Sequence, residues 1–164
     1  MIYSTQSALN TMAENLILHT YSLHAPMFYS MDADTEHKCT VVANLLQDYS
    51  FFFVNYDDIL IPNHPILISI VLQMIFHLHG GKHFVDFSNM DIVFALASTV
   101  VCCTLKEYKT GRYVQLEFGG EMCSIFDTCL EKIKEIRGNP VLRSLLDAMK
   151  TRVVAHSGQL VTSD

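Results

Sequence analysis

The chain contains little of what several protein classes require. It has no tryptophan, seven glycines and four prolines in 164 residues. So few chain-breaking residues leave long uninterrupted segments, which favour helices over a turn-rich β-sandwich. Lysine and arginine number 11 against 17 acidic residues, and they form no basic cluster. Because contact with phosphate needs clustered cations, no nucleic-acid partner is expected.

Segments that would carry the chain into or across a membrane are also missing. The N-terminus lacks a basic region followed by an apolar one, so no secretory signal is predicted. The longest uncharged runs, residues 65–79 and 92–105, are shorter than the roughly 18–20 residues of a spanning helix. Five cysteines without framework spacing indicate buried thiols in a reducing compartment. We expect a cytoplasmic protein without a transmembrane anchor.

What the sequence does have is hydrophobic periodicity. Half of the residues are hydrophobic, and they recur at spacings of three and four along most of the chain. This pattern predicts helices over residues 11–23, 39–60, 66–78, about 89–108, 111 to about 136, and 141–155. Asp34 or Thr35 is the expected N-cap before the second of these. No convincing strand pair is found.

The expected fold class is therefore all-α. We predict a globular bundle of six to eight helices wrapped around central apolar helices, with a hydrophobic groove on its surface. It forms one domain over residues 1–164, with a helical core of about 11–156 and a flexible tail at 157–164. The segment Ile66 to Leu78 is apolar on every face, which predicts a fully buried central helix or one at an interface.

One arginine stands where two apolar patterns meet. The stretch Lys109-Thr110-Gly111-Arg112 is followed by a run from Glu117 to Cys123 that reads EFGGEMC. In both order and content, these segments resemble the first homology motif of the Bcl-2 family of apoptosis regulators. Residues 153–160 fall where the family's second motif would lie, while residues 15–23 and 39–49 resemble its fourth and third motifs. The chain has one residue fewer than the family between Arg112 and Phe118, and its shortened form resembles members carried by large DNA viruses.

The resemblance implies an inhibitor of apoptosis that acts in the cytoplasm of a host cell, with recruitment to mitochondria through its partners. Its partners would be pro-apoptotic Bcl-2 family proteins, whose amphipathic BH3-type helix enters the groove. Arg112 would pair with the aspartate of that helix, and Gly111 would allow close approach of the ligand backbone. Thr110 would cap the following helix and Lys109 would add charge at the rim. The groove walls would be Tyr49, Phe53, Thr99 and Cys103.

Other interpretations stay open. Without the resemblance, an arginine at a helix start is more often a surface ion-pair residue. The alternative function is a helical virulence scaffold, or a homodimer, that uses the fold for another protein interaction. The three histidines His77, His79 and His83 are poorly spaced for one metal site, and Cys102-Cys103 indicates packing more than a nucleophile. We therefore expect no catalytic residue, no metal and no cofactor, and we predict that the protein is not an enzyme.

Overall fold

The computed structural model describes residues 11, 13–21, 23, 31–52, 54–56, 59–61, 65–77, 90–116 and 120–159. Within these ranges the fold is all-α, as predicted, with six α-helices. An N-terminal helical segment (residues 13–20) precedes the other elements, which in chain order are α2 (Met31–Leu46), the 3₁₀-helix η1 (Gln47–Phe52), β1 (Val54–Tyr56), β2 (Ile59–Ile61), α3 (Pro65–His77), α4 (Met90–Glu107), α5 (Gly120–Gly138) and α6 (Pro140–Gln159).

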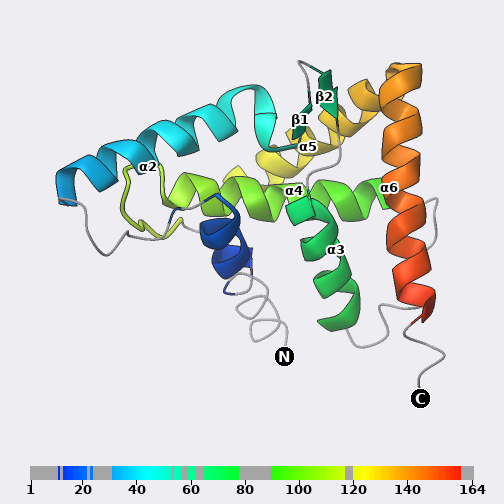
Figure 1. Ribbon diagram of the computed structural model, residues 1–164, viewed down its shortest axis with the longest axis horizontal. Coiled ribbons are helices and arrows are strands. Elements are labelled where there is room, and N and C mark those ends of the chain that lie inside the picture. The colour runs from blue at the N-terminus through cyan, green and yellow to red at the C-terminus, as the bar shows by residue number, and fades with distance from the viewer. Residues whose placement is uncertain are drawn as a thin grey trace.

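Helix α4 is the centre of the domain, and α5, α3 and α2 pack against it. Figure 1 shows α4 running across the middle, with α2 above its left part and α6 crossing its right end. Ten of its residues are buried, and several of them are small, including Ala95, Ala97 and Ser98. Small side chains let neighbouring helices approach from several directions. Of the two predictions for residues 66–78, the fully buried central helix is wrong, because Ile68 and Leu72 of α3 are only partly buried. The other, a helix at an interface, stays a prediction.

The predicted helix over residues 39–60 is also wrong beyond its first half. Helix α2 begins earlier than its expected cap at Asp34 or Thr35 and ends at Leu46. Asp48 and Tyr49 then adopt left-handed backbone angles, with φ of 50° and 57°, which end the α-helix. The hydroxyl of Ser50 donates to the carbonyl oxygens of Asn44 (2.6 Å) and Leu45 (3.2 Å), which α2 leaves without helical partners.

A short antiparallel hairpin follows where no strand pair was expected. Val54 pairs with Ile61, and Tyr56 pairs with Ile59. These strands contain β-branched and aromatic residues, which fit extended backbone. Their apolar residues also occur at spacings compatible with a helix, so the pattern alone favoured the wrong element. The correction is local, since the hairpin has only three residues in each strand.

The strained backbone before the hairpin gives a testable expectation. Asp48→Gly should raise the free energy of unfolding by about 0.5–1 kcal/mol, because glycine adopts a left-handed conformation without a side-chain clash. Asp48 is exposed, so the substitution removes no core contact. The same substitution at exposed Asp127, inside α5, should lower stability by a few tenths of a kcal/mol. Urea denaturation of both variants checks the opposite signs, and a loss of stability in Asp48→Gly would contradict the expectation.

The last two helices meet at a sharp junction that the sequence predicted. The side-chain oxygen of Asn139 accepts hydrogen bonds from the backbone N–H groups of Val141 (3.0 Å) and Leu142 (3.3 Å). Asn139 is thus the N-cap of α6, and Pro140 occupies the first helical position, which requires no N–H donor. Helix α6 runs through Gln159, so helical structure extends past the predicted core boundary at residue 156 and into the predicted tail.

Candidate functional site

The segment that carries Arg112 is a loop, which we call the α4–α5 loop (residues 108–116). The sequence predicted a helix beginning near Gly111, but α5 begins at Gly120. Thr110 therefore does not cap a helix, and its hydroxyl instead donates to the carbonyl oxygen of Arg112 at 3.2 Å. On a single helix, the residue missing between Arg112 and Phe118 would turn one part of the motif by about 100° relative to the other. This does not apply, because Arg112 lies in the loop and not on α5.

Three other elements hold this loop in position. The Tyr108 hydroxyl donates to a carboxylate oxygen of Glu14, in the N-terminal helical segment, at 2.5 Å. The backbone N–H of Val114 donates to the carbonyl oxygen of Glu107 at 2.8 Å, and that of Leu116 donates to the Glu107 carboxylate at 3.2 Å. The loop thereby returns along the end of α4. These contacts leave the side chains of Lys109 and Arg112 exposed.

Gly111 is the third anchor of the loop, and its setting differs from the predicted one. It is buried, with a φ of 75°, and its Cα faces Thr35 of α2. A Cβ at this position would lie 2.5 Å from Thr35 Cγ2 and 2.6 Å from the Thr35 carbonyl oxygen. The space next to this glycine is therefore filled by the same chain, and the absence of a side chain allows α2 to approach, not a ligand backbone.

The residues predicted to line the groove are not all on the surface. Thr99 is 1% exposed, and its hydroxyl donates to the Ala95 carbonyl oxygen at 2.8 Å. Helix α5 covers this face of α4, since Thr99 also forms a hydrogen bond with the Cys129 thiol. Tyr49 is partly buried in the same region and forms a hydrogen bond with Thr128 of α5. Phe53 lies outside the described residues.

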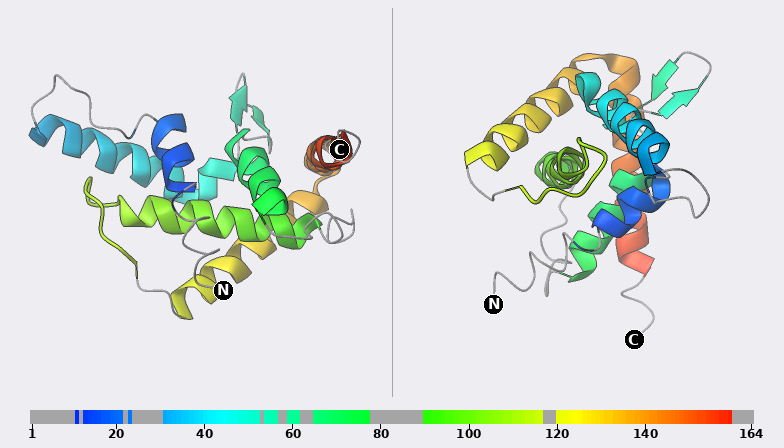
Figure 2. Two further views of the ribbon diagram at one scale, coloured as in Figure 1. Left: turned by 90° about the horizontal axis from the view of Figure 1, so that it is seen from below. Right: turned by 90° about the vertical axis from the view of Figure 1, so that its left-hand side faces the viewer.

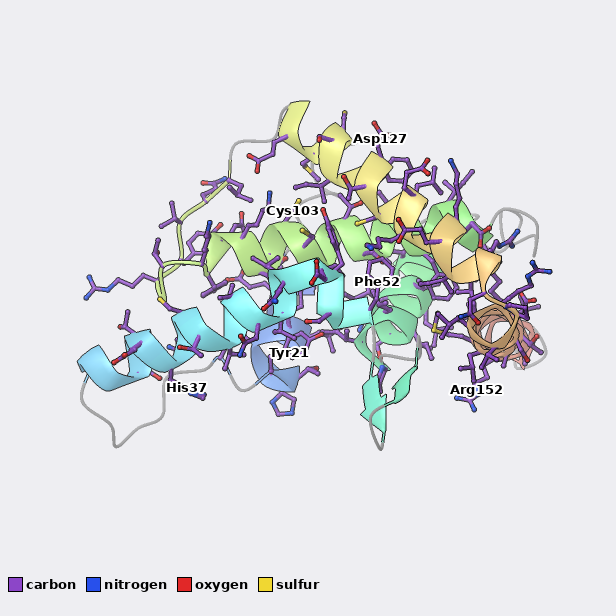
Figure 3. The ribbon with its side chains drawn as sticks, turned by 90° about the horizontal axis from the view of Figure 1, so that it is seen from above. Tyr21, His37, Phe52, Cys103, Asp127 and Arg152 are labelled. Carbon is purple, nitrogen blue, oxygen red and sulfur yellow. The ribbon has the colours of Figure 1, made fainter. Side chains whose placement is uncertain are left out.

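Cys103 is only partly buried and belongs to a group of thiols between α4 and α5. Figure 3 shows it on α4, with α5 on one side and η1 on the other in that view. Burial raises the pKa of Cys102 to about 11 and the pKa values of Cys103 and Cys129 to about 12. These three thiols are protonated at neutral pH, which makes them poor nucleophiles. All five cysteines are free of disulfides; Cys39 is partly buried and Cys123 is exposed, so the expectation of buried thiols holds only in part.

Sequence reasoning missed a buried ionic cluster at the other end of α4. The Asp91 carboxylate contacts Lys150 of α6 at 2.5 Å and Arg137 of α5 at 2.7 Å, and Lys150 is fully buried. One signal was available in the sequence. Lys150 follows Leu146 by four residues, on the apolar face of α6, where a lysine needs an acidic partner.

A carboxylate that anchors the loop makes stability depend on pH. The pKa of Glu107 is raised, mainly because its carboxylate is partly buried. The nearby Glu14 carboxylate raises this pKa further. A raised pKa in the folded state means that stability is lost as pH rises through it. Glu107→Gln keeps a carbonyl oxygen for the Leu116 N–H and removes the titration. The difference in unfolding free energy between the variant and the native chain should therefore favour the variant more at pH 7 than at pH 4. Urea denaturation at both pH values measures it. The same gain in unfolding free energy at both pH values would contradict a raised pKa of Glu107.

The fold and this loop define an all-α domain that displays two cations on an anchored loop. The family described as a domain of unknown function, DUF6532, matches residues 2–136, and the chain belongs to this family. No curated protein and no solved structure matches the chain. None of the described helices combines the length and the apolar character needed to cross a membrane. Among the described residues, no group of three or more histidine, cysteine or acidic side chains could hold a metal ion.

Proposed function

We propose that this domain binds a helix of another protein and performs no chemistry of its own. One observation carries the proposal: the α4–α5 loop is fixed by contacts to three other elements, while Lys109 and Arg112 on it remain exposed. A binding group that is already held in position costs less ordering entropy when the partner arrives. The raised pKa values of the α4 and α5 thiols support a role without nucleophilic catalysis.

The finer proposal concerns the partner and the process. Following the motif resemblance, we propose that the domain inhibits apoptosis by sequestering BH3-type helices of pro-apoptotic proteins in the cytoplasm. In this proposal Arg112 pairs with the ligand aspartate. Its support is the order of the four motif matches and the exposure of Arg112. An arginine suits this role because its planar guanidinium can bind a carboxylate through two parallel hydrogen bonds.

Titration of the purified chain with a labelled BH3-type helical peptide tests the proposal. We expect binding by the native chain and about tenfold weaker binding by Arg112→Ala, the effect of losing a partly desolvated ion pair worth about 1.4 kcal/mol. Arg112→Lys should lie between the two, because an ammonium cannot bind a carboxylate in bidentate fashion.

A charge-matched control separates the pair from bulk electrostatics. Arg152 is an exposed arginine on α6, on the opposite side of the molecule from the α4–α5 loop in the view of Figure 3. Arg152→Ala should bind the peptide as tightly as the native chain. An equal loss in both variants would reduce Arg112 to a contribution to net charge. No binding by the native chain at about 100 μM would overturn the proposed helix-binding function for this class of peptide.

A further inference from the structure

Helix α6 lies outside the family match. The match covers residues 2–136, and α6 follows it as Pro140–Gln159. This helix stands at the right-hand end of the molecule in Figure 1 and, seen nearly along its axis, in the left panel of Figure 2. It packs mainly against α3 and α5. Because α6 lies at one end of the domain, it can move away without displacing the central helix α4.

Few side chains attach α6 to the rest of the domain. Over residues 140–155, where burial is described, its buried apolar side chains are Leu146, Met149 and Val153. Their spacings of three and four place them on one narrow stripe, and Val141 near the start of the helix is 66% exposed. Helix α4, by comparison, has ten buried residues. An element with few buried apolar contacts opens at a lower free energy than the core of the same fold.

The carboxylate that α6 contacts has a cation as partner both with and without α6. The Lys150 ammonium is fully buried and contacts the Asp91 carboxylate at 2.5 Å. The same carboxylate contacts Arg137 at 2.7 Å, and Arg137 belongs to α5, with a side chain that is 42% exposed. When α6 moves away, Lys150 enters water and Asp91 keeps Arg137, so the carboxylate is not left without a partner. The buried lysine therefore positions α6 without preventing its release.

The connection between α5 and α6 has the features of a hinge. Gly138, Asn139 and Pro140 are all exposed, and in the described part of the chain nothing packs within 4 Å of an added Cβ at Gly138. The side chain of Asn139 caps α6, so the helix keeps its N-cap when it rotates about the preceding residue. The Arg143 side chain donates to the Arg137 carbonyl oxygen at 2.9 Å, an exposed contact that water can replace after rotation.

We infer that α6 is a releasable helix, which opens as a unit by rotation at Gly138 and closes again over α3 and α5. In the closed state it covers a helix-length surface of these two helices, and Lys150 pairs with Asp91. In the open state Asp91 pairs with Arg137 alone and the covered surface is accessible. This inference concerns the first turn of α4, whereas the proposed function concerns the loop after its last turn, and neither depends on the other.

Amide hydrogen exchange of the full chain, measured by mass spectrometry, tests the release of α6. We expect the amides of residues 144–155 to exchange together, at least tenfold faster than the amides in the middle of α4. Their exchange should also depend less on urea, because opening of α6 exposes less surface than global unfolding does. Equal rates and equal urea dependence for α6 and α4 would overturn the inference, since α6 would then open only when the whole domain unfolds.

A second experiment supplies α6 as a separate peptide. The full-chain variant Leu146→Gln/Val153→Gln removes two buried anchors from its own α6 and leaves the covered surface unchanged. We expect α4 to stay protected from exchange in this variant. A labelled peptide of residues 139–159 should bind the variant at least tenfold more tightly than the native chain, whose own α6 competes at a high effective concentration. Val141→Gln, at an exposed residue of α6, is the matched control and should behave as the native chain does.

Asp91 reports where the peptide binds. Adding Asp91→Asn to the double variant should weaken binding of the native peptide at least tenfold, because Lys150 of the peptide loses its carboxylate. A peptide carrying Lys150→Met should lose much less affinity from the same change. Equal losses for the two peptides would overturn the assignment of the surface. Loss of protection throughout α4 in the double variant would overturn the release of α6 as a unit. Arg112→Ala should change none of these results, which separates this test from that of the proposed function.

Discussion

Replacing Gly111 with alanine is expected to destabilise the domain by about 2–5 kcal/mol. Alanine in a left-handed conformation costs about 1–2 kcal/mol. The new methyl group would also meet Thr35 Cγ2 at 2.5 Å and the Thr35 carbonyl oxygen at 2.6 Å. Overpacking of this kind adds about 1–3 kcal/mol. Urea denaturation of the purified variant measures the loss.

Two further variants separate the causes. Gly138→Ala is the matched control, because no atom lies within 4 Å of its added Cβ, and it should leave stability unchanged or raise it by up to about 1 kcal/mol. Adding Thr35→Ala to Gly111→Ala removes the Cγ2 contact but not the contact with the carbonyl oxygen, so only part of the loss should be recovered. A Gly111→Ala variant within about 0.5 kcal/mol of the native chain would contradict the close approach of α2 to the loop.

Asp91→Asn is expected to cost about 3–5 kcal/mol of unfolding free energy. The substitution leaves the fully buried ammonium of Lys150 without its carboxylate, and a buried charge that loses its partner is strongly destabilising. Asp91 also lies in the first turn of α4, where a negative charge interacts favourably with the helix dipole. Denaturant titration monitored by circular dichroism gives the change.

The partners of Asp91 provide the comparison. Lys150→Met should cost less than Asp91→Asn, because the Asp91 carboxylate keeps its contact with Arg137 at 2.7 Å. The exposed pair of Lys134 and Glu131 is the control, and Glu131→Gln should change stability by less than about 1 kcal/mol. Equal losses of unfolding free energy in Asp91→Asn and Glu131→Gln would contradict this expectation, because the ion pairs of Asp91 would then contribute no more than an exposed pair.

The helices that the sequence predicted well are those with strong local signals. For α3 and α6, apolar spacing and a nearby proline defined the start. For α4, the capping residues Ser88-Asn89 and the apolar pattern gave both ends within two residues. The pattern failed in residues 108–116, where Tyr113, Val114 and Leu116 occur at spacings that also suit a helix. In the structure, hydrogen bonds to Glu107 hold this stretch as a loop. Such a contact between separate segments leaves no trace in local periodicity.

In the candidate site, too, local features were predictable and contacts between distant segments were not. The sequence singled out Lys109 and Arg112 as cations at the junction between two helices, and both are exposed there. It could not reveal that α2 packs closely against Gly111 through Thr35, since Thr35 lies 76 positions earlier in the chain. Nor could it separate the buried Thr99 from the exposed Leu96, because both have apolar neighbours along the same helix.

The sequence by itself determined the all-α class, most of the helix positions and the cations of the α4–α5 loop. These depend on local spacing, breaking residues and composition, which act within a few residues along the chain. Only the tertiary structure decided that α4 is central, that Asp91 joins α5 and α6, and that Ile92 and Leu96 of α4 are exposed. Those features depend on which helices meet, and that choice reflects the packing of the whole domain.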